Sequence, residues 1–349
     1  MNVSKQLGKW YEINKRILPW REHLNPYHIW LSEIILQQTR VSQGMSYYLK
    51  FIKKFPSIES LASVSVEDVL VHWQGLGYYT RARNLHKAAN IIVEKYRGQF
   101  PEEYDLIREL PGIGEYTAAA IASLAFNKPY PAIDGNVYRV LARFFGIYSP
   151  VNQAKSKSDF YKAAFEIMDA KNPGRHNQAM IELGALICLP KKPKCIECPI
   201  SQACYAFQKQ IVKELPIRQK KLNSVNRYFY YLVIRRNKKF YIKQRKQNDI
   251  WALLYEFPLI ETHSAIDLTE LTSSDMWKGI FQTTNPEIKK ISKEYIHKLS
   301  HQTLHAWFIK IEIHSPLLIN IKQVNETQLE DYPFPRLIDR YLKEERINQ

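Results

Sequence analysis

The four cysteines of this 349-residue chain all lie between positions 188 and 204. Six residues separate Cys188 from Cys195, two separate Cys195 from Cys198, and five separate Cys198 from Cys204. In a reducing cytosol, thiols set this close are more often metal ligands than disulfide partners. Zinc ligands usually form two close pairs separated by a longer loop, whereas here three cysteines follow one outlier. The spacing therefore favours a [4Fe-4S] cluster over zinc, and over four unrelated core cysteines.

The composition is strongly basic, with 50 Lys+Arg against 34 Asp+Glu and a formal net charge of +16. Such an excess favours a polyanionic partner, either nucleic acid or an anionic membrane surface. Residues 191–246 hold 16 of the basic residues but only Glu197 and Glu214 as acids, so the charge is concentrated around and after the cysteine segment. A merely solvated linker would show the same bias.

The sequence lacks the signals of membrane insertion and export. No run approaches the roughly 18 apolar residues of a membrane span, and the N-terminal segment MNVSKQLGKWYEINKRIL has no continuous apolar core of signal-peptide length. We therefore expect a soluble cytoplasmic protein, associated with the nucleoid if the source is bacterial. We also expect no membrane partner and a monomeric state.

The pattern of apolar residues predicts two domains. Residues 1–210 show apolar positions at helical spacing, in segments such as PYHIWLSEIILQQT and RARNLHKAANIIVEKY, separated by turns rich in glycine and proline. Residues 228–349 contain short runs typical of strands, such as YFYYLVI and TLHAWFIKIEI. Residues 211–227 are polar and charged, as in a linker. We predict an all-α first domain and an α+β or mainly β second domain.

The segment LPGIGEYTAAA, which begins at Leu110, is typical of a helix-hairpin-helix motif. A helix end is followed by a tight turn containing Gly112 and Gly114, and then by a new helix start. The glycines allow backbone N–H groups to converge beside a helix N-terminus, where they bind a phosphate without side chains. On its own the motif predicts non-specific contact with a DNA backbone, and an ordinary helix–helix turn would have a similar sequence.

The cysteine spacing resembles that of the endonuclease III and MutY superfamily of DNA glycosylases. Further segments are similar to MutY-type adenine DNA glycosylases: LPWR at 18–21, WLSEIILQQTR at 30–40, GLGYYTRARNLHKAA at 75–89, AIDGNVYRVLARFF at 132–145 and NQAMIELGALIC at 177–188. With the hairpin and the cysteines, the matches extend from residue 18 to residue 204 without a long gap. The resemblance implies base-excision repair of double-stranded DNA that contains adenine opposite 8-oxoguanine or guanine.

The resemblance assigns the chemistry to two acidic residues. Asp134 stands where a helix N-cap is expected, and it matches the catalytic carboxylate of the family. Glu33 is the sole acid on an apolar helix, where a solvated face is the ordinary explanation, and it matches the general acid. Breaking a base–sugar bond leaves positive charge on the sugar and requires a proton on the departing base. We expect Asp134, with Asn136 beside it, to stabilise the cation and a desolvated Glu33 to protonate adenine.

Residue 116 distinguishes two classes within the superfamily. In bifunctional endonuclease III-type enzymes, the residue two positions after the second hairpin glycine is a lysine, which cleaves the strand through a Schiff base. Here that residue is Tyr116, which cannot form the imine, so the resemblance implies a monofunctional glycosylase. The Tyr116 hydroxyl could instead hydrogen-bond Asp134, although core packing with an incidental hydroxyl is an alternative.

Recognition of the base must follow its extrusion, because the bond to be cut lies inside the duplex stack. Gln38 and Tyr78 match family residues that fill or wedge the helix, with Thr39 and Leu76 as their neighbours. Arg21 and Gln178 match positions around the adenine pocket. Ordinary packing or surface contact is the alternative for each of these residues.

The second half resembles the Nudix-like C-terminal domain of the same family, which senses 8-oxoguanine. Its best local match is Leu299-Ser300-His301, where many relatives carry Phe-Ser-His. Ser300 and His301 retain the hydrogen-bonding part of the readout, whereas Leu299 replaces the aromatic residue. The carboxylate-rich G-x5-E-x7-R-E-x2-E-E-x-G pattern of Nudix hydrolases is absent from the sequence, so we expect no pyrophosphatase activity.

Two other functions are compatible with part of the sequence. A thymine mismatch glycosylase of the same superfamily can share the hairpin tyrosine and the cysteines, but Glu33 and the second domain argue against it. A non-catalytic iron–sulfur DNA-binding module would need only the hairpin and the cluster. Assays on duplexes that pair A or T with G would separate the three functions.

Overall fold

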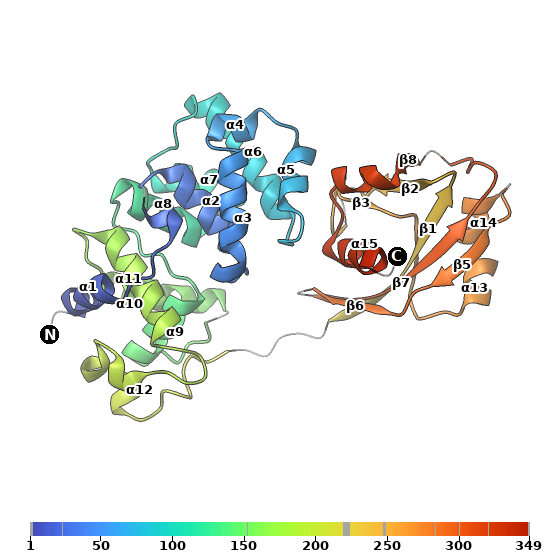
Figure 1. The fold of residues 1–349 in the computed structure, drawn as a ribbon. Coiled ribbons are helices and arrows are strands. Elements are labelled where there is room, and N and C mark those ends of the chain that lie inside the picture. The colour runs from blue at the N-terminus through green and yellow to red at the C-terminus, as the bar shows by residue number, and fades with distance from the viewer. Residues whose placement is uncertain are drawn as a thin grey trace. The chain divides into compact units, whose positions relative to one another are not determined.

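The computed structural model describes residues 3–347 except 23, 152, 219–223, 247–248, 283, 300 and 320. The chain forms two compact units (Figure 1). The first unit comprises Met1–Ser63 and Asn84–Lys220, and the second comprises Val64–Arg83 and Lys221–Gln349. Within the described parts of the chain, no helix is long and apolar enough to cross a membrane.

The described residues of the first unit form helices and no strand, which confirms the predicted all-α class. Short 3-10 turns connect several of them. The α-helices are α1 (Val3–Asn14), α2 (Pro26–Leu36), α3 (Val41–Lys54), α4 (Ile58–Ala62), α6 (Thr80–Tyr96), α7 (Tyr104–Glu109), α8 (Glu115–Phe126), α9 (Gly135–Phe145), α10 (Lys157–Glu166), α11 (Pro173–Leu186) and α12 (Tyr205–Gln208).

The predicted helix-hairpin-helix consists of α7, a glycine-containing turn and α8. Gly112 has a φ of +79°, a left-handed conformation that favours glycine. A Cβ atom at Gly112 would also lie 2.7 Å from the Cβ of Asn84, so the turn approaches α6 closely only with glycine at this position. Gly114 is the N-cap of α8, and both glycines are exposed. The backbone N–H groups at the start of α8 are therefore accessible to a ligand.

Helices α9 and α11 pack closely because residue 184 is a glycine. A Cβ atom at Gly184 would lie 2.9 Å from the carbonyl oxygen of Asn136, in the first turn of α9. Leu141 and Leu183 belong to the buried core that both helices share. The contact holds the N-terminus of α9, where Asp134 is the N-cap, against the neighbouring helix.

The second unit is built on a mixed sheet. Its described strands are β1 (Val225–Arg236), β2 (Lys239–Gln244), β3 (Tyr255–Glu256), β4 (Leu259–Thr262), β5 (Glu287–Ile291), β6 (Tyr295–Lys298), β7 (Gln302–Glu312) and β8 (Lys322–Asn325). The central strands β1 and β7 run parallel, with Tyr231 opposite Phe308, and the other strand pairs are antiparallel.

Helices cover both faces of this sheet (Figure 1). Helix α15 (Arg336–Ile347) packs on one face, and α13 (Leu268–Ser273) and α14 (Asp275–Phe281) pack on the other. Alternate residues of β1 serve the two cores, because successive side chains of a strand point to opposite faces. Phe229 and Tyr231 belong to the α15 core, whereas Tyr230 and Leu232 belong to the other core. The arrangement confirms an α+β second domain.

Described residues near both ends of the expected 211–227 linker belong to folded elements. Leu215 is buried, and its carbonyl oxygen accepts a hydrogen bond from Arg143 Nε at 2.9 Å. At the other end β1 begins at Val225, inside the expected 211–227 range. The second unit also includes α5 (Val66–Trp73) and the residues that follow, where the Tyr79 hydroxyl donates to the Phe334 carbonyl oxygen at 3.0 Å.

Candidate active site and cysteine segment

A cavity of about 610 Å³ opens among α2, α8, α11 and the N-terminus of α9. Most of the side chains expected at a glycosylase site line it, although they come from distant parts of the chain. These are Arg21, Glu33, Gln38, Thr39, Tyr116, Asp134, Asn136 and Gln178. The hairpin glycines do not line this cavity. Leu76 and Tyr78 belong to the second unit, where Leu76 is buried and Tyr78 is 48% exposed.

Glu33 combines a desolvated carboxyl group with access to the cavity. The fold raises its pKa to about 7, chiefly because burial disfavours the charged form, and the nearby negative charge of Asp134 acts in the same direction. A hydrogen bond from the Tyr116 hydroxyl and the positive charge of Arg21 oppose the shift. Near neutral pH the protonated acid is therefore well populated, as a proton donor requires.

Asp134 has a different environment from Glu33. Its Oδ1 accepts hydrogen bonds from the backbone N–H groups of Asn136 and Val137, both at 2.8 Å, and its Oδ2 accepts one from Asn136 Nδ2 at 2.8 Å. Burial raises the pKa of Asp134, and these hydrogen bonds act against that rise. The positive end of the helix dipole also favours the carboxylate. N-capping and exposure to the cavity are thus compatible roles of one side chain.

Tyr116 bonds Glu33, a different partner from the Asp134 carboxylate that the sequence suggested. Burial and the charges of Glu33 and Asp134 raise the Tyr116 pKa well above its ordinary value, so the hydroxyl remains a neutral donor. The Asp134 oxygens are already occupied by the α9 N-terminus and Asn136, which explains why the tyrosine bonds the other acid. Tyr116 lines the cavity together with Glu33 and Asp134.

Glu182 is a buried charge that the sequence analysis missed. Its side chain has no exposed area, and its carboxylate accepts hydrogen bonds from Arg16 Nε at 2.9 Å and from Arg21 Nη1. Both arginines line the cavity. The signal was available, because Glu182 is a lone acid within NQAMIELGALIC, just as Glu33 is within its own helix. Gln178, on the same helix, accepts a hydrogen bond from the Tyr11 hydroxyl.

Two arginines of α9 contact the cysteine segment, and one of them, Arg139, also bonds the cavity residue Asn136. Arg139 donates from Nη2 to Asn136 Oδ1 at 2.9 Å and from Nε to the carbonyl oxygen of Cys188 at 2.6 Å. Arg143 donates from Nη1 to Cys188 Sγ at 3.3 Å and to the carbonyl oxygen of Leu189 at 2.8 Å. Basic groups therefore surround the first cysteine and connect its backbone to the Asp134 hydrogen-bond network.

All four cysteines are free thiols and partly exposed. Burial raises the pKa of the Cys198 thiol, and the charges of the neighbouring Cys188, Cys204 and Cys195 act in the same direction. Among the described residues, no group of three or more His, Cys, Asp or Glu side chains is already arranged to hold a metal ion. Four neighbouring thiols beside a guanidinium nevertheless have the donor chemistry of an anionic iron–sulfur cluster site.

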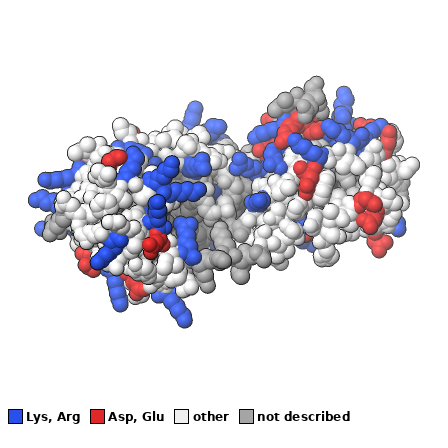
Figure 2. Space-filling view, turned by 90° about the horizontal axis from the view of Figure 1, so that it is seen from below, with Lys and Arg blue, Asp and Glu red and all other residues white. Residues whose placement is uncertain are grey.

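Lysine and arginine side chains predominate over acidic ones on one face of the first unit (Figure 2). Such a surface favours contact with the phosphates of DNA. The exposed hairpin turn adds main-chain N–H groups, which can donate hydrogen bonds to the same phosphates. His301 is exposed in the second unit, while Leu299 is half-buried against the α15 core. Ser300 lies outside the described residues.

Comparisons with known proteins agree with this architecture. Residues 31–163 match the family model of the HhH-GPD superfamily of base excision DNA repair proteins, and residues 230–344 match the model of the NUDIX domain. An adenine DNA glycosylase of Buchnera aphidicola subsp. Schizaphis graminum is 35% identical over 319 residues, which cover 91% of this chain and 87% of that protein. The adenine DNA glycosylase of Arabidopsis thaliana is 33% identical, covering 91% of this chain and 57% of that protein.

A solved structure of a thermostable thymine-DNA glycosylase has a similar fold, with a TM-score of 0.55 and 29% identity. The match covers 59% of this chain and 95% of that one. A trapped endonuclease III–DNA covalent intermediate has a TM-score of 0.51 and 23% identity, covering 60% of this chain and 95% of that one. The helical fold is thus shared with these two structures, whereas the Buchnera and Arabidopsis relatives that match about nine tenths of the chain are adenine DNA glycosylases.

Proposed function

The chain belongs to the adenine DNA glycosylase family, and we propose that its substrate is adenine paired with 8-oxoguanine or guanine in double-stranded DNA. Its activity is that of an adenine-specific base-excision repair glycosylase, which hydrolyses the N-glycosidic bond and leaves an abasic site. One observation carries the proposed mechanism: a single cavity holds two carboxyl groups in contrasting environments, Glu33 and Asp134.

Glu33 acts as the general acid in this mechanism. Its protonated carboxyl group donates a proton to the adenine ring, and the electron pair of the C1′–N9 bond then leaves with the base. The pKa of about 7 supports this role, since an ordinary glutamate would be almost fully ionised at neutral pH. The Tyr116 hydrogen bond fixes the position of the carboxyl group.

Asp134 stabilises the positive charge that develops at C1′, either as a carboxylate or through a covalent adduct that water later hydrolyses. Three hydrogen bonds and the helix N-terminus favour its ionised form. Asn136 supplies two of these hydrogen bonds and is thus a positioning residue for Asp134.

Tyr116 makes the reaction monofunctional, because a phenol at this position cannot form a Schiff base with the sugar. A thymine-removing activity is the alternative within the superfamily, and the structure of a thymine-DNA glycosylase resembles the helical unit. The proton donor Glu33 favours the adenine reaction, since a departing purine is activated by protonation.

DNA binding is proposed to use three groups of residues. The hairpin glycines Gly112 and Gly114 contact the phosphate backbone, as their exposure and position beside the α8 N-terminus allow. Residues that fill or wedge the duplex after base extrusion are Gln38, Thr39, Leu76 and Tyr78. Arg21 and Gln178 border the extruded adenine, in keeping with their place in the cavity wall. The active species is proposed to be a monomer.

The two halves of the chain are proposed to divide the task. Within the 1–210 range expected for the catalytic domain, catalysis is assigned to the first unit, because residues 64–83 belong to the second unit. Recognition of 8-oxoguanine is assigned to residues 228–349, and residues 211–227 connect these two parts of the chain. Lesion recognition is assigned to Ser300 and His301, next to Leu299. The exposure of His301 supports this assignment, because a base-reading side chain must reach the DNA.

Cys188, Cys195, Cys198 and Cys204 are proposed to ligate a [4Fe-4S] cluster. The clustered free thiols and the Arg143 guanidinium 3.3 Å from Cys188 Sγ support this assignment. When bound, such a cluster would cross-link the segment that follows α11 and hold its lysines in place for phosphate contact. The chemistry of base removal remains with the cavity residues.

An assay on three duplexes tests the proposed function. Duplexes carrying A opposite 8-oxoguanine, A opposite guanine and T opposite guanine are incubated with the protein and then treated with alkali, which breaks strands at abasic sites. Cleavage of both adenine substrates, faster opposite 8-oxoguanine, is expected. Cleavage of the T:G duplex alone would establish the thymine alternative, and binding without cleavage of any duplex would establish a non-catalytic module.

A further inference from the structure

The turn between β6 and β7, which carries His301, is anchored at one side by the first residues of β1. The Leu299 N–H group donates to the carbonyl oxygen of Gln302 at 2.8 Å and closes the turn. The carbonyl oxygen of His301 accepts a hydrogen bond from the Val225 N–H group at 3.1 Å. The exposed His301 side chain therefore projects from a backbone that β1 holds in place.

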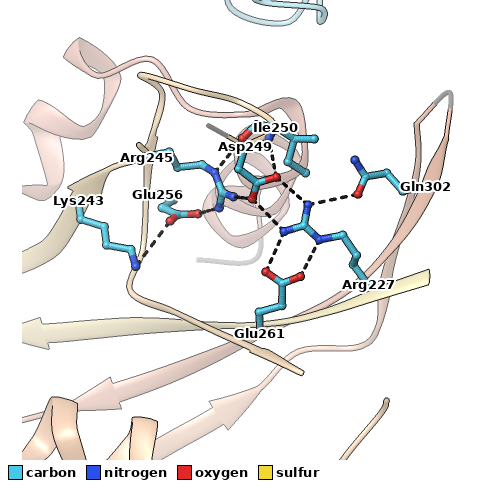
Figure 3. Close-up of polar contacts among 8 residues, drawn as sticks. All are labelled: Arg227, Lys243, Arg245, Asp249, Ile250, Glu256, Glu261 and Gln302. Atoms are coloured by element: carbon cyan, nitrogen blue, oxygen red, sulfur yellow. Dashed lines mark hydrogen bonds and ion pairs between the residues drawn. The ribbon is translucent and has the colours of Figure 1, made fainter. Parts of the chain in front are cut away.

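Arg227, two residues further along β1, adds a side-chain anchor to the same turn (Figure 3). Its Nη1 donates to Gln302 Oε1 at 3.2 Å, directly after His301 in the chain. The same guanidinium donates to both Asp249 oxygens at 2.8 Å, and to the Glu261 oxygens at 2.6 and 2.8 Å. A guanidinium has five N–H donors, and five acceptor contacts are present, so its plane is completely specified.

Asp249, one of the carboxylates that Arg227 binds, is itself held by a second ion pair. Asp249 also accepts from Arg245 Nη2 at 2.5 Å, and Arg245 pairs in turn with the buried Glu256 (Figure 3). The Arg227 guanidinium lies 4.9 Å from the centre of the buried Phe229 ring, which supports it from below. With its two positive neighbours the pKa of Asp249 is lowered to about 2, so this carboxylate stays charged across the physiological range.

We expect this ion-pair network to fix the orientation of its side chains more than it raises the free energy of unfolding. Networks of ion pairs that are partly desolvated often add little net stability, because the cost of desolvation offsets their attraction. Such a network instead fixes the orientation of each side chain in it. Among the described side chains that accept from Arg227, Gln302 is uncharged, and it adjoins His301, the residue assigned to lesion recognition.

We propose that Arg227 is a positioning residue for 8-oxoguanine recognition, acting through Gln302 on the turn that carries His301. The inference rests on the proposed role of that turn in lesion recognition. If so, Arg227 on β1 contributes to the preference for 8-oxoguanine over guanine without touching the DNA itself.

Two variants test the proposal from different sides. Arg227→Lys keeps the positive charge but has three donors on a flexible stem, so it cannot hold two carboxylates and Gln302 together. Gln302→Leu removes the connection to the turn and leaves the ion pairs intact. The matched control is Arg236→Lys, at the far end of the same strand, where the arginine Nε donates to the His314 carbonyl oxygen at 3.1 Å.

Single-turnover rates on A:8-oxoguanine and A:guanine duplexes, together with thermal midpoints, provide the readout. Arg227→Lys and Gln302→Leu should each lower the ratio of the two rates by about threefold or more, the scale of one lost hydrogen bond. Arg236→Lys should leave the ratio unchanged. The double variant Arg227→Lys/His301→Ala should have no lower ratio than His301→Ala alone, because both changes act on one contact.

The outcomes separate this inference from the proposed function. An unchanged ratio in both Arg227→Lys and Gln302→Leu, with a lowered ratio in His301→Ala, would overturn the role of Arg227 while leaving that of the turn. Equal loss of both rates with a lower thermal midpoint would show a purely structural network and would also overturn it. An unchanged ratio in His301→Ala would instead remove the proposed function of the turn, and the inference with it.

Discussion

Glu182 forms an ion pair with Arg21, which lines the candidate active-site cavity, although Glu182 itself does not line it. The glutamate is fully buried, whereas Arg21 lines the cavity beside Glu33 and Asp134. Because the same carboxylate also pairs with Arg16, one buried anion sets the position of two cationic side chains. A residue that does not line the cavity therefore orients two positively charged side chains that do.

Replacement of Glu182 by Gln should lower both stability and activity. Removing one partner of a buried ion pair leaves uncompensated charge, and we expect a loss of about 3 kcal/mol in the free energy of unfolding. Adenine removal should slow because Arg21 is no longer held. Chemical denaturation and single-turnover kinetics measure both effects. Glu103→Gln is the control, since the Glu103 side chain is 66% exposed and its pair with Lys128 is a surface pair. Equal behaviour of the two variants would contradict the assignment.

Glu33→Gln and Asp134→Asn should each reduce base removal by a factor of about 100 or more, because one loses the proton donor and the other the cation stabiliser. Binding to mismatched DNA should remain measurable, since the phosphate contacts come from other residues. Glycosylase assays and gel-shift titrations check the two quantities. The exposed Glu94, changed to Gln, provides the control for loss of one acidic group. Wild-type activity in either carboxyl variant would exclude the mechanism.

The pKa of Glu33 predicts how the rate depends on pH. The protonated form of Glu33 is the active one, so the single-turnover rate should fall as pH rises through about 7. At acidic pH the rate should fall again as Asp134, whose pKa is raised by burial, becomes protonated. In Glu33→Gln the residual rate should lose the fall near pH 7. A wild-type rate that stays level well above pH 7 would show that Glu33 does not supply the proton.

Purified protein should be yellow-brown and contain iron. Cys198→Ser should lose most of the colour and iron, because the three remaining thiolates leave one iron atom of the cluster without a protein ligand. Visible absorbance measures the colour, and metal analysis measures the iron and zinc contents. Ser201→Ala, in the same segment, should retain the cluster. Fully active, colourless wild-type protein with stoichiometric zinc would identify the site as a zinc site instead.

Tyr116→Lys places an amine beside Glu33 and Asp134 in the cavity. If residue 116 faces the reacting sugar, the amine can form an imine with it, and borohydride reduction then traps a covalent protein–DNA product. Denaturing electrophoresis detects this product, and wild-type protein should give none. A trapped product in Asp134→Asn/Tyr116→Lys at the same yield would argue against a role of Asp134 in opening the bond.

Sequence patterns predicted the elements of this fold better than their partners. The helical spacing of RARNLHKAANIIVEKY predicted a helix in the region of α6, and the start of α9 after Asp134 followed from its preference for the N-cap position. The parallel pairing of β1 with β7 was not predictable, because residues such as Tyr231 and Phe308 meet only through the topology of the whole sheet.

The same distinction applies to the cavity. The resemblance brought Glu33, Tyr116 and Asp134 into one proposed site, and the structure places them around one cavity. The hydrogen-bond partner of Tyr116 depended on which carboxylate was already satisfied by backbone donors, which a linear motif does not contain. The role of Glu182 was not predictable from its own segment, because its partners Arg16 and Arg21 lie far away in the sequence.

The parallel register of β1 and β7 has a consequence for biosynthesis. β1 is the first strand of its sheet to leave the ribosome, but its central neighbour β7 ends only at Glu312. Until then the aromatic and β-branched residues of β1 lack their main partner, and such unpaired strands are prone to aggregate. Premature termination before Glu312 would therefore yield a truncated chain whose unpaired β1 is prone to aggregate. We expect quality-control proteases to degrade this chain together with its helical first unit.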